Sequence, residues 1–285
     1  MTDKKIALIG VRGTNEPGTG NGHMNGMLFG FSHEVVARAK TKFSPQNPGP
    51  YVELVALDYP ATYANPKSYG RSRTEGEQTL VNLVHKYTAE GFDVYLAGYS
   101  QGATLAGNVG TMVGEKIKGL YLLSDSLRPR GANSTGQPHN KGYNTRTENA
   151  FHGWGVAGER TVYGPIVRHY AIPGDVITDA FDDSLVRSVA DFSEWFGFTP
   201  QDLRPLAADI LRKVQEKAFQ NLSWFQNLMK GMGLLKLPEV ASESIKDALS
   251  YPRVHVSYGS TNFPGRKHSY LVEMARDFLA DAGIG

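Results

Sequence analysis

The sequence predicts an α/β protein in which a parallel β-sheet is covered by helices on both faces. Short, nearly continuous apolar segments alternate along the chain with segments whose apolar residues recur at helical spacing. The short segments lack a polar alternation, as is typical of strands buried on both faces of a sheet. Strands joined through helices run parallel, with right-handed crossovers. A chain of 285 residues with 40% hydrophobic residues is large enough to bury such a core.

Each predicted element is marked by its apolar pattern and by the residues that end it. Helix 74–89 has four apolar residues at helical spacing, and Thr74 with Glu77 fits a capping box at its start. The last helix ends at Gly283, a usual stop signal. The strands are predicted at residues 5–10, 51–58, 93–97, 118–123, 166–172 and 254–259, and the helices at residues 27–42, 74–89, 101–114 and 268–282.

Two long segments interrupt this alternation. Residues 126–165 are rich in Gly, Asn, Pro, Ser and Arg and show no apolar periodicity, which indicates a long loop that could shape a binding groove. Residues 181–250 return to helical spacing and predict a helical insert. The chain therefore divides into one α/β domain, made of residues 1–180 and 251–285, and an inserted helical segment.

Composition and motifs exclude several function classes. A net charge of +2 argues against a dedicated nucleic-acid binder, and no apolar run is long enough to predict a transmembrane helix. The N-terminal apolar stretch is too short for a signal peptide, which predicts synthesis in the cytoplasm. The absence of cysteine excludes disulfides and thiolate–metal sites. No H-E-x-x-H, Walker lysine or G-x-G-x-x-G motif is found in the expected context, so neither a metal nor an organic cofactor is expected.

The stretch GYSQG at residues 98–102 carries the strongest chemical signal. It matches G-x-S-x-G between a predicted strand and a predicted helix, which is the context of a nucleophile elbow in an α/β-hydrolase. The turn holds the Ser100 hydroxyl above the carboxyl edge of the sheet. The backbone N–H of Gln101 then faces an oxyanion that forms at this point. A second oxyanion donor is expected from the loop after the first strand, where Gly13 permits close approach and Thr14 supplies an N–H.

A nucleophilic serine needs an acid and a histidine, which follow it in the chain in this fold. The tripeptide PGD at residues 173–175 directly follows the predicted strand 166–172, and Asp175 is the predicted acid. His268 lies in a loop at the start of the last helix, where its imidazole can reach the sheet edge, and is the predicted base. His255 lies within the strand-like VHVSYG and is the alternative base, although a structural role suits it better.

Other acids and histidines have less specific explanations. The rivals of the predicted acid are interpreted as charges and caps at the start of the next helix. His23, in the first Gly-rich loop, could line a groove but is interpreted as a surface residue. The rival acids are Asp179, Asp182 and Asp183.

Three motifs together resemble the cutinase-type serine esterases: RGTNEPG after the first strand, LDYPA after the second, and AGYSQGA at the elbow. The resemblance is clearest over residues 4–125 and resumes at 165–180 and 265–282. It implies a cutinase-like α/β-hydrolase with a five-stranded parallel sheet. The chain departs from secreted cutinases in having no cysteine, and in the long separation between Asp175 and His268.

These departures are similar to the lysin B group, the phage-encoded mycolyl-arabinogalactan esterases, which have a helical insert between acid and histidine. The resemblance implies a monomeric catalytic domain that uses Ser100, Asp175 and His268 to hydrolyse ester-linked mycolic acids of the cell wall. It also implies synthesis in the host cytoplasm and action at the cell envelope after release. The insert 181–250 would then help to engage the wall polysaccharide, although it could instead be a lid over the acyl chain.

Two alternatives remain open at this stage. The first is a general cutinase or lipase-type carboxylesterase that acts on simpler lipid esters. The second is a non-catalytic wall-binding protein built on a hydrolase shell, because the order of Ser, Asp and His along the chain does not establish their geometry.

Overall fold

A computed structural model describes residues 4–18, 24–42, 51–62, 69–130, 153–181 and 253–284. Its centre is a five-stranded sheet in the order β2-β1-β3-β4-β6, and every neighbouring pair in it runs parallel. The predicted parallel sheet flanked by helices is confirmed. The strands of this sheet are β1 (Lys5–Val11), β2 (Tyr51–Ala56), β3 (Asp93–Tyr99), β4 (Ile117–Leu123) and β6 (Ile166–Tyr170).

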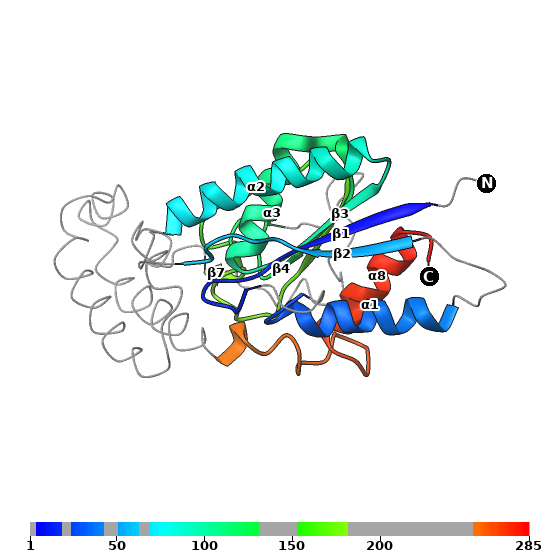
Figure 1. The fold of residues 1–285 in the computed structure, drawn as a ribbon. Helices are drawn as coiled ribbons and strands as arrows, with labels where there is room; N and C mark the ends of the chain where they lie inside the picture. The colour runs from blue at the N-terminus through cyan, green and yellow to red at the C-terminus, as the bar shows by residue number, and fades with distance from the viewer. Residues whose placement is uncertain are drawn as a thin grey trace, which may run out of the picture.

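Two pairs of helices cover the two faces of the sheet (Figure 1). Helices α2 (Tyr69–Ala89) and α3 (Gln101–Val113) pack on one face, and helices α1 (Leu28–Lys42) and α8 (Tyr270–Asp281) pack on the other. A short 3₁₀ helix η1 (Gly114–Lys116) precedes β4. Strands β5 (Gly153–Trp154) and β7 (Ala180–Phe181) form a small antiparallel pair beside the main sheet.

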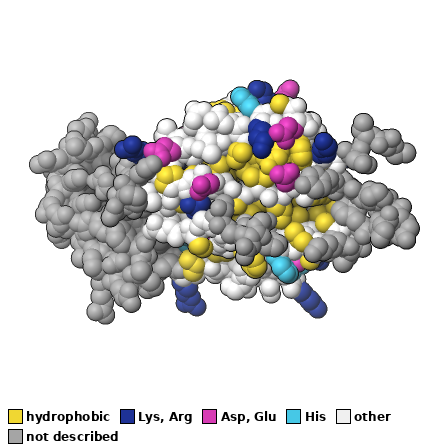
Figure 2. Space-filling view, viewed as in Figure 1, with side chains coloured by type: hydrophobic (Ala, Val, Ile, Leu, Met, Phe, Trp, Pro, Cys, Tyr) yellow, Lys and Arg dark blue, Asp and Glu magenta, His cyan; other side chains and the backbone are white. Residues whose placement is uncertain are grey.

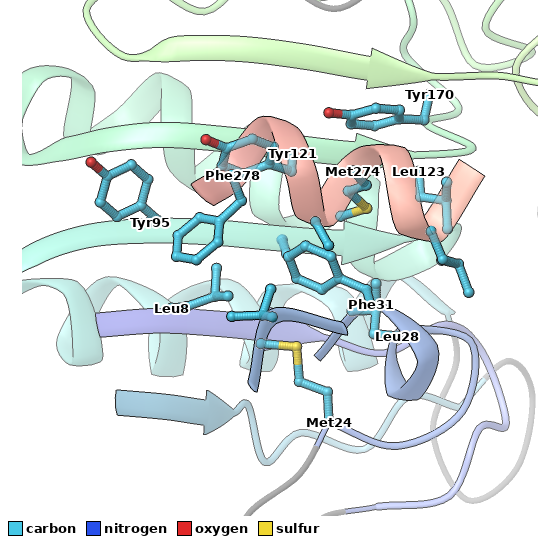
Figure 3. Packing of buried hydrophobic residues seen from close by; sticks show 14 of the residues in the cluster. Leu8, Met24, Leu28, Phe31, Tyr95, Tyr121, Leu123, Tyr170, Met274 and Phe278 are labelled. Carbon is cyan, nitrogen blue, oxygen red and sulfur yellow. The ribbon is translucent and has the colours of Figure 1, made fainter. Parts of the chain in front are cut away.

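The core on the α1/α8 face is built around aromatic side chains. Phe278 of α8 meets Tyr95 and Tyr121 edge to face, at ring-centroid distances of 5.3 and 5.9 Å. Edge-to-face contacts add favourable electrostatics to the burial of apolar area. Figure 3 shows these rings above β3 and β4, with Leu28 and Phe31 of α1 completing the layer. This packing fixes α8 and the segment before it against the sheet.

Two local predictions are wrong. Helix α2 begins at Tyr69, so Thr74 lies inside the helix, where its hydroxyl donates to the Gly70 carbonyl instead of capping. Residues 254–259 are not a strand, because residues 253–255 are helical and residues 258–260 form a turn. The predicted insert lies outside the described residues from residue 182 onward, as do His23, Asp182 and Asp183.

The surface of the described residues carries mixed charges. On the face drawn in Figure 2, acidic and basic side chains lie near one another among hydrophobic ones, and the described residues visible there form no broad basic surface. Among the described helices, none is both long and apolar enough to cross a bilayer.

Candidate active site

Ser100 lies on a strained turn between β3 and α3. Its backbone has φ 54° and ψ −118°, a conformation that residues other than glycine rarely adopt. The Ser100 N–H donates to the Leu123 carbonyl at 3.0 Å, and the Ser100 carbonyl accepts the Ala103 N–H at 2.9 Å. These bonds tie the turn to β4 and to the first turn of α3. Strain of this kind persists where the surrounding structure imposes it, typically at functional sites.

The glycines two residues on either side of Ser100 make room for this turn. A Cβ on Gly98 would lie 2.3 Å from the Gly102 carbonyl oxygen, and one on Gly102 would lie 2.1 Å from the Val11 carbonyl oxygen. Both contacts are with backbone, so neither can be relieved by a side-chain rotation. The glycines of the G-x-S-x-G motif are therefore required by the close approach of β1, β3 and α3.

We expect Gly102→Ala to lower the free energy of unfolding by about 3 kcal/mol, because the added methyl overlaps backbone that is fixed in the sheet. Chemical denaturation, followed by circular dichroism, measures this loss. Gly70→Ala is the matched control, because Gly70 lies in α2 with nothing within 4 Å of the new Cβ. It should leave the stability unchanged or raise it by up to about 1 kcal/mol. Equal effects of the two substitutions would contradict the steric argument.

The imidazole of His255 lies beside Ser100. Its Nε2 is 3.0 Å from the Ser100 Oγ, and its Nδ1 is 3.1 and 3.2 Å from the two carboxylate oxygens of Asp175. A carboxylate only accepts hydrogen bonds, so Nδ1 carries the proton and the Nε2 lone pair faces the serine hydroxyl. The Tyr99 ring stacks on the imidazole at 5.1 Å, and the Tyr99 hydroxyl donates to the His255 carbonyl at 2.8 Å.

The expectation that His268 lies against Ser100 is wrong. His268 hydrogen-bonds Glu273 through its Nε2, at the start of α8. His255 occupies the position beside Ser100, and residues 253–255 are helical where the sequence predicted a strand. The alternation of Val254, His255 and Val256 made this segment resemble a strand. Pro252, two residues before Val254, was an available contrary signal, since proline is common at the start of a helix.

Asp175 lies where the sequence placed the acid, and its carboxylate is fully buried. Oδ2 accepts hydrogen bonds from the hydroxyls of Ser124 at 2.5 Å and Tyr258 at 2.7 Å, and Oδ1 accepts the Ile177 N–H at 3.2 Å. Burial acts to raise the pKa of Asp175. The interaction with His255 and the hydrogen bonds from His255, Ser124 and Tyr258 outweigh burial and hold this pKa below its usual value. Neither hydroxyl was recognised from the sequence.

Asp179, a rival acid in the sequence, has a structural environment. Its carboxylate accepts the N–H groups of Gly153 at 2.9 Å and Gly174 at 2.8 Å. It also lies 3.6 Å from the buried guanidinium of Arg128. Asp179 therefore joins the β5 segment to the loop that presents Asp175.

The two predicted oxyanion donors come from the loop after β1 and from the first residue of α3. The Thr14 hydroxyl donates to the Gln101 side-chain carbonyl at 3.4 Å, so the loop after β1 lies against the start of α3. Glu16 holds this loop by accepting the N–H groups of Gly13 at 2.7 Å and Met27 at 2.6 Å. Burial raises the pKa of Glu16, although both backbone hydrogen bonds oppose that shift. Thr14 and Gln101 are thus adjacent, and their role as oxyanion donors stays a prediction.

The described residues contain no cluster of three or more His, Cys, Asp or Glu side chains that could hold a metal ion. What they do contain is a serine hydroxyl, an imidazole with its lone pair toward that hydroxyl, and a buried carboxylate on the other side of the ring. This is the arrangement that activates a serine for nucleophilic attack on an acyl group.

No protein-family model matches the chain, and no curated protein matches its sequence. Among solved structures, lysin B from Mycobacteriophage D29 is similar with a TM-score of 0.47 and 18% identity, over 96% of this chain and 99% of that chain. A cutinase-like protein from Cryptococcus sp. is similar with a TM-score of 0.40 and 15% identity, over 67% of this chain and 89% of that chain. An acetyl xylan esterase is similar with a TM-score of 0.42 and 16% identity, over 68% of this chain and 96% of that chain. Identities and TM-scores this low do not identify a reaction, which has to be inferred from the side chains of the site.

Proposed function

We propose that this protein is a serine esterase that hydrolyses carboxylic esters through an acyl-enzyme. The observation that carries the proposal is the continuous hydrogen-bonded chain from Ser100 through His255 to Asp175, held between β3, β6 and residues 253–255. Each member has the chemistry that its place requires: a nucleophile, a proton acceptor and a buried anion.

In the proposed reaction, the Ser100 Oγ attacks the ester carbonyl while His255 Nε2 takes its proton. Asp175 keeps the other imidazole proton on Nδ1 and stabilises the imidazolium. The N–H groups of Gln101 and Thr14 stabilise the oxyanion, and His255 then gives its proton to the departing alcohol. A water molecule, deprotonated by His255, next attacks the acyl-serine, and the carboxylic acid leaves as Ser100 regains its proton.

The substrate that we propose is the ester between mycolic acids and cell-wall arabinogalactan. The support for it is the likeness of RGTNEPG, LDYPA and AGYSQGA to the cutinase-type esterases, together with the long separation between acid and histidine that is similar to lysin B. Action at the cell envelope after phage-mediated release, as a monomer, belongs to the same proposal. A carboxylesterase for simpler lipid esters is the second candidate, because the triad itself does not select the acyl chain.

A fluorophosphonate probe tests the proposed chemistry, because it phosphonylates only a serine that a neighbouring base has activated. We expect one adduct per chain, located on Ser100 by peptide mass spectrometry, and none on Ser100→Ala. Hydrolysis of p-nitrophenyl butyrate should be lost together with the labelling. A folded wild-type chain that neither reacts with the probe nor hydrolyses the ester would favour the wall-binding alternative.

The substrate is tested separately on purified mycobacterial cell walls. Release of free mycolic acids by the wild type, and none by Ser100→Ala, would support the mycolyl ester. Hydrolysis of p-nitrophenyl butyrate without release from the wall would instead support the general carboxylesterase.

A further inference from the structure

We propose that Ser124 and Tyr258 are positioning residues that hold the Asp175 carboxylate, and through it His255, in the orientation needed for proton transfer. The inference deepens the proposed function and rests on it. It concerns two buried hydroxyls, one at the end of β4 and one in the turn that follows His255. Both are fully buried, as is the carboxylate that they share.

The direction of the Tyr258 hydrogen bond is fixed by its surroundings. Its hydroxyl oxygen accepts the Ile172 N–H at 3.2 Å, and its proton goes to Asp175 Oδ2 at 2.7 Å. The ring lies edge-on to Tyr99 and Tyr270, at centroid distances of 6.3 and 5.5 Å. Tyr99 also stacks on His255. Tyr258 therefore contacts the carboxylate directly and the imidazole through one ring.

Ser124 bridges the carboxylate and the imidazole. Its Oγ lies 2.5 Å from Asp175 Oδ2 and 3.1 Å from His255 Nδ1. Because the carboxylate can only accept, the hydroxyl proton points to Asp175, and an oxygen lone pair remains for the imidazole N–H. Ser124 thus donates to the acid and accepts from the base.

The backbone of Ser124 is held in an uncommon conformation to make this bridge. Its φ is 55°, and it is one of four residues other than glycine with positive φ among those described, Ser100 being another. The Ser124 N–H donates to the Tyr170 carbonyl at 2.9 Å, which fixes the residue past the end of β4. Glycine would adopt this φ with less strain, so the presence of serine points to a use for its hydroxyl.

Together these contacts leave the carboxylate one orientation. Oδ2 receives two hydroxyl protons, Oδ1 receives the Ile177 N–H, and the imidazole N–H lies between the two oxygens. Both hydroxyls donate hydrogen bonds to the carboxylate and so stabilise its negative charge, which weakens the attraction of that charge for the imidazolium. Removing either one should increase the attraction between Asp175 and the imidazolium, although removing Ser124 also takes away an acceptor of the imidazole N–H. Glu16 is another carboxyl whose charge interacts with His255, and it is unchanged in all the variants below.

The test compares Tyr258→Phe, Ser124→Ala and Ser124→Gly with the wild type. For Tyr258→Phe we expect the acidic limb of the kcat/KM profile to move up by about one pH unit, since a hydrogen bond to a charged group is worth about as much as one unit. For the two Ser124 variants we expect a smaller upward shift, because the lost acceptor of the imidazole N–H opposes it. In all three variants we also expect kcat to fall about tenfold with little change in KM, since the lost interaction orients the base. Ser124→Gly removes the hydroxyl while relieving the strained φ, so it can fold even if Ser124→Ala does not.

Tyr121→Phe is the matched control, because Tyr121 is also a buried tyrosine that donates to a carboxylate, at 2.9 Å to Asp281, away from Ser100. It should lower stability without moving the pH profile. An imidazole titration by NMR, with ¹³C-labelled histidine in the full chain, follows the protonation of His255 without any substrate. Its midpoint should move together with the acidic limb of the kcat/KM profile.

The outcomes separate the two proposals. A wild type that hydrolyses no ester would contradict the proposed function, while the NMR titration would still show whether Ser124 and Tyr258 affect the protonation of His255. An active wild type whose profile and titration stay in place in both Tyr258→Phe and Ser124→Gly would overturn the inference and reduce the two hydroxyls to packing.

Discussion

If the proposed function holds, His255→Ala is expected to lower kcat for a soluble ester by about six orders of magnitude, as loss of the general base does in a serine protease. The reason is geometric, because His255 Nε2 is the group 3.0 Å from the Ser100 hydroxyl. Without it, the Ser100 hydroxyl loses the proton acceptor beside it. Steady-state kinetics, with Ser100→Ala as the background, measures the loss. Labelling of Ser100 by the fluorophosphonate should disappear in parallel.

His268→Ala is the matched control, and it distinguishes between the two histidines that the sequence offered as candidate bases. His268 hydrogen-bonds Glu273 at the start of α8, so its loss should affect that helix terminus and leave kcat close to the wild-type value. Thermal unfolding of both variants checks that the fold is kept. An inactive His268→Ala beside an active His255→Ala would reverse the assignment that the geometry supports.

The local parts of the site could be predicted from the sequence. The G-x-S-x-G motif is contained within residues 98–102, and its glycines are required by backbone contacts that any strand–turn–helix of this kind makes. Asp175 lies in the turn that follows β6, so the parallel sheet places it at the same edge as Ser100. These predictions needed only the apolar pattern and the rule that parallel strands end together.

The base could not be predicted in this way, because its position depends on contacts between distant segments. His255 and Ser100 are 155 residues apart. Whether residues 254–259 run as a strand or turn back toward the sheet depends on packing, such as that of Tyr258 against Tyr99 and Tyr270. Ser124 was missed for a similar reason, since nothing in its neighbours along the chain indicates a carboxylate from beyond β6.

The start of α2 could not be predicted from the local sequence either. Residues 69–73 have no apolar periodicity, so the sequence predicted a start at residue 74. In the structure Ser72 is fully buried, and its hydroxyl accepts the Thr62 N–H at 3.1 Å. A tertiary contact therefore extends the helix over residues that the local pattern leaves undecided.

Asp175→Asn is expected to lower kcat by about four orders of magnitude, because the amide disturbs the tautomer of the base. The carboxylate accepts protons on both oxygens, from Ser124 and Tyr258 on Oδ2 and from His255. An amide offers one acceptor oxygen and one NH₂ group. If the NH₂ faces His255, the imidazole proton moves to Nε2, and the ring can no longer accept the Ser100 proton. If the NH₂ group faces the hydroxyls of Ser124 and Tyr258 instead, hydrogen-bond donors face donors, and the hydrogen bonds that both hydroxyls make to the carboxylate are disturbed. Steady-state kinetics on a soluble ester gives kcat.

The same substitution has a signature in the dependence of stability on pH. The pKa of Asp175 is lower in the folded chain than its ordinary value of 3.8, so its charge stabilises the fold above that pH, and the contribution disappears as the pH falls through the folded-state value. The difference in Tm between wild type and Asp175→Asn should therefore be largest near neutral pH and shrink in acid. Asp179→Asn removes a neighbouring buried carboxylate that binds backbone N–H groups, so it should also lower Tm but keep kcat. A comparable loss of kcat in Asp179→Asn would mean that losing any buried charge in this loop impairs the site, and would remove the specific role of Asp175.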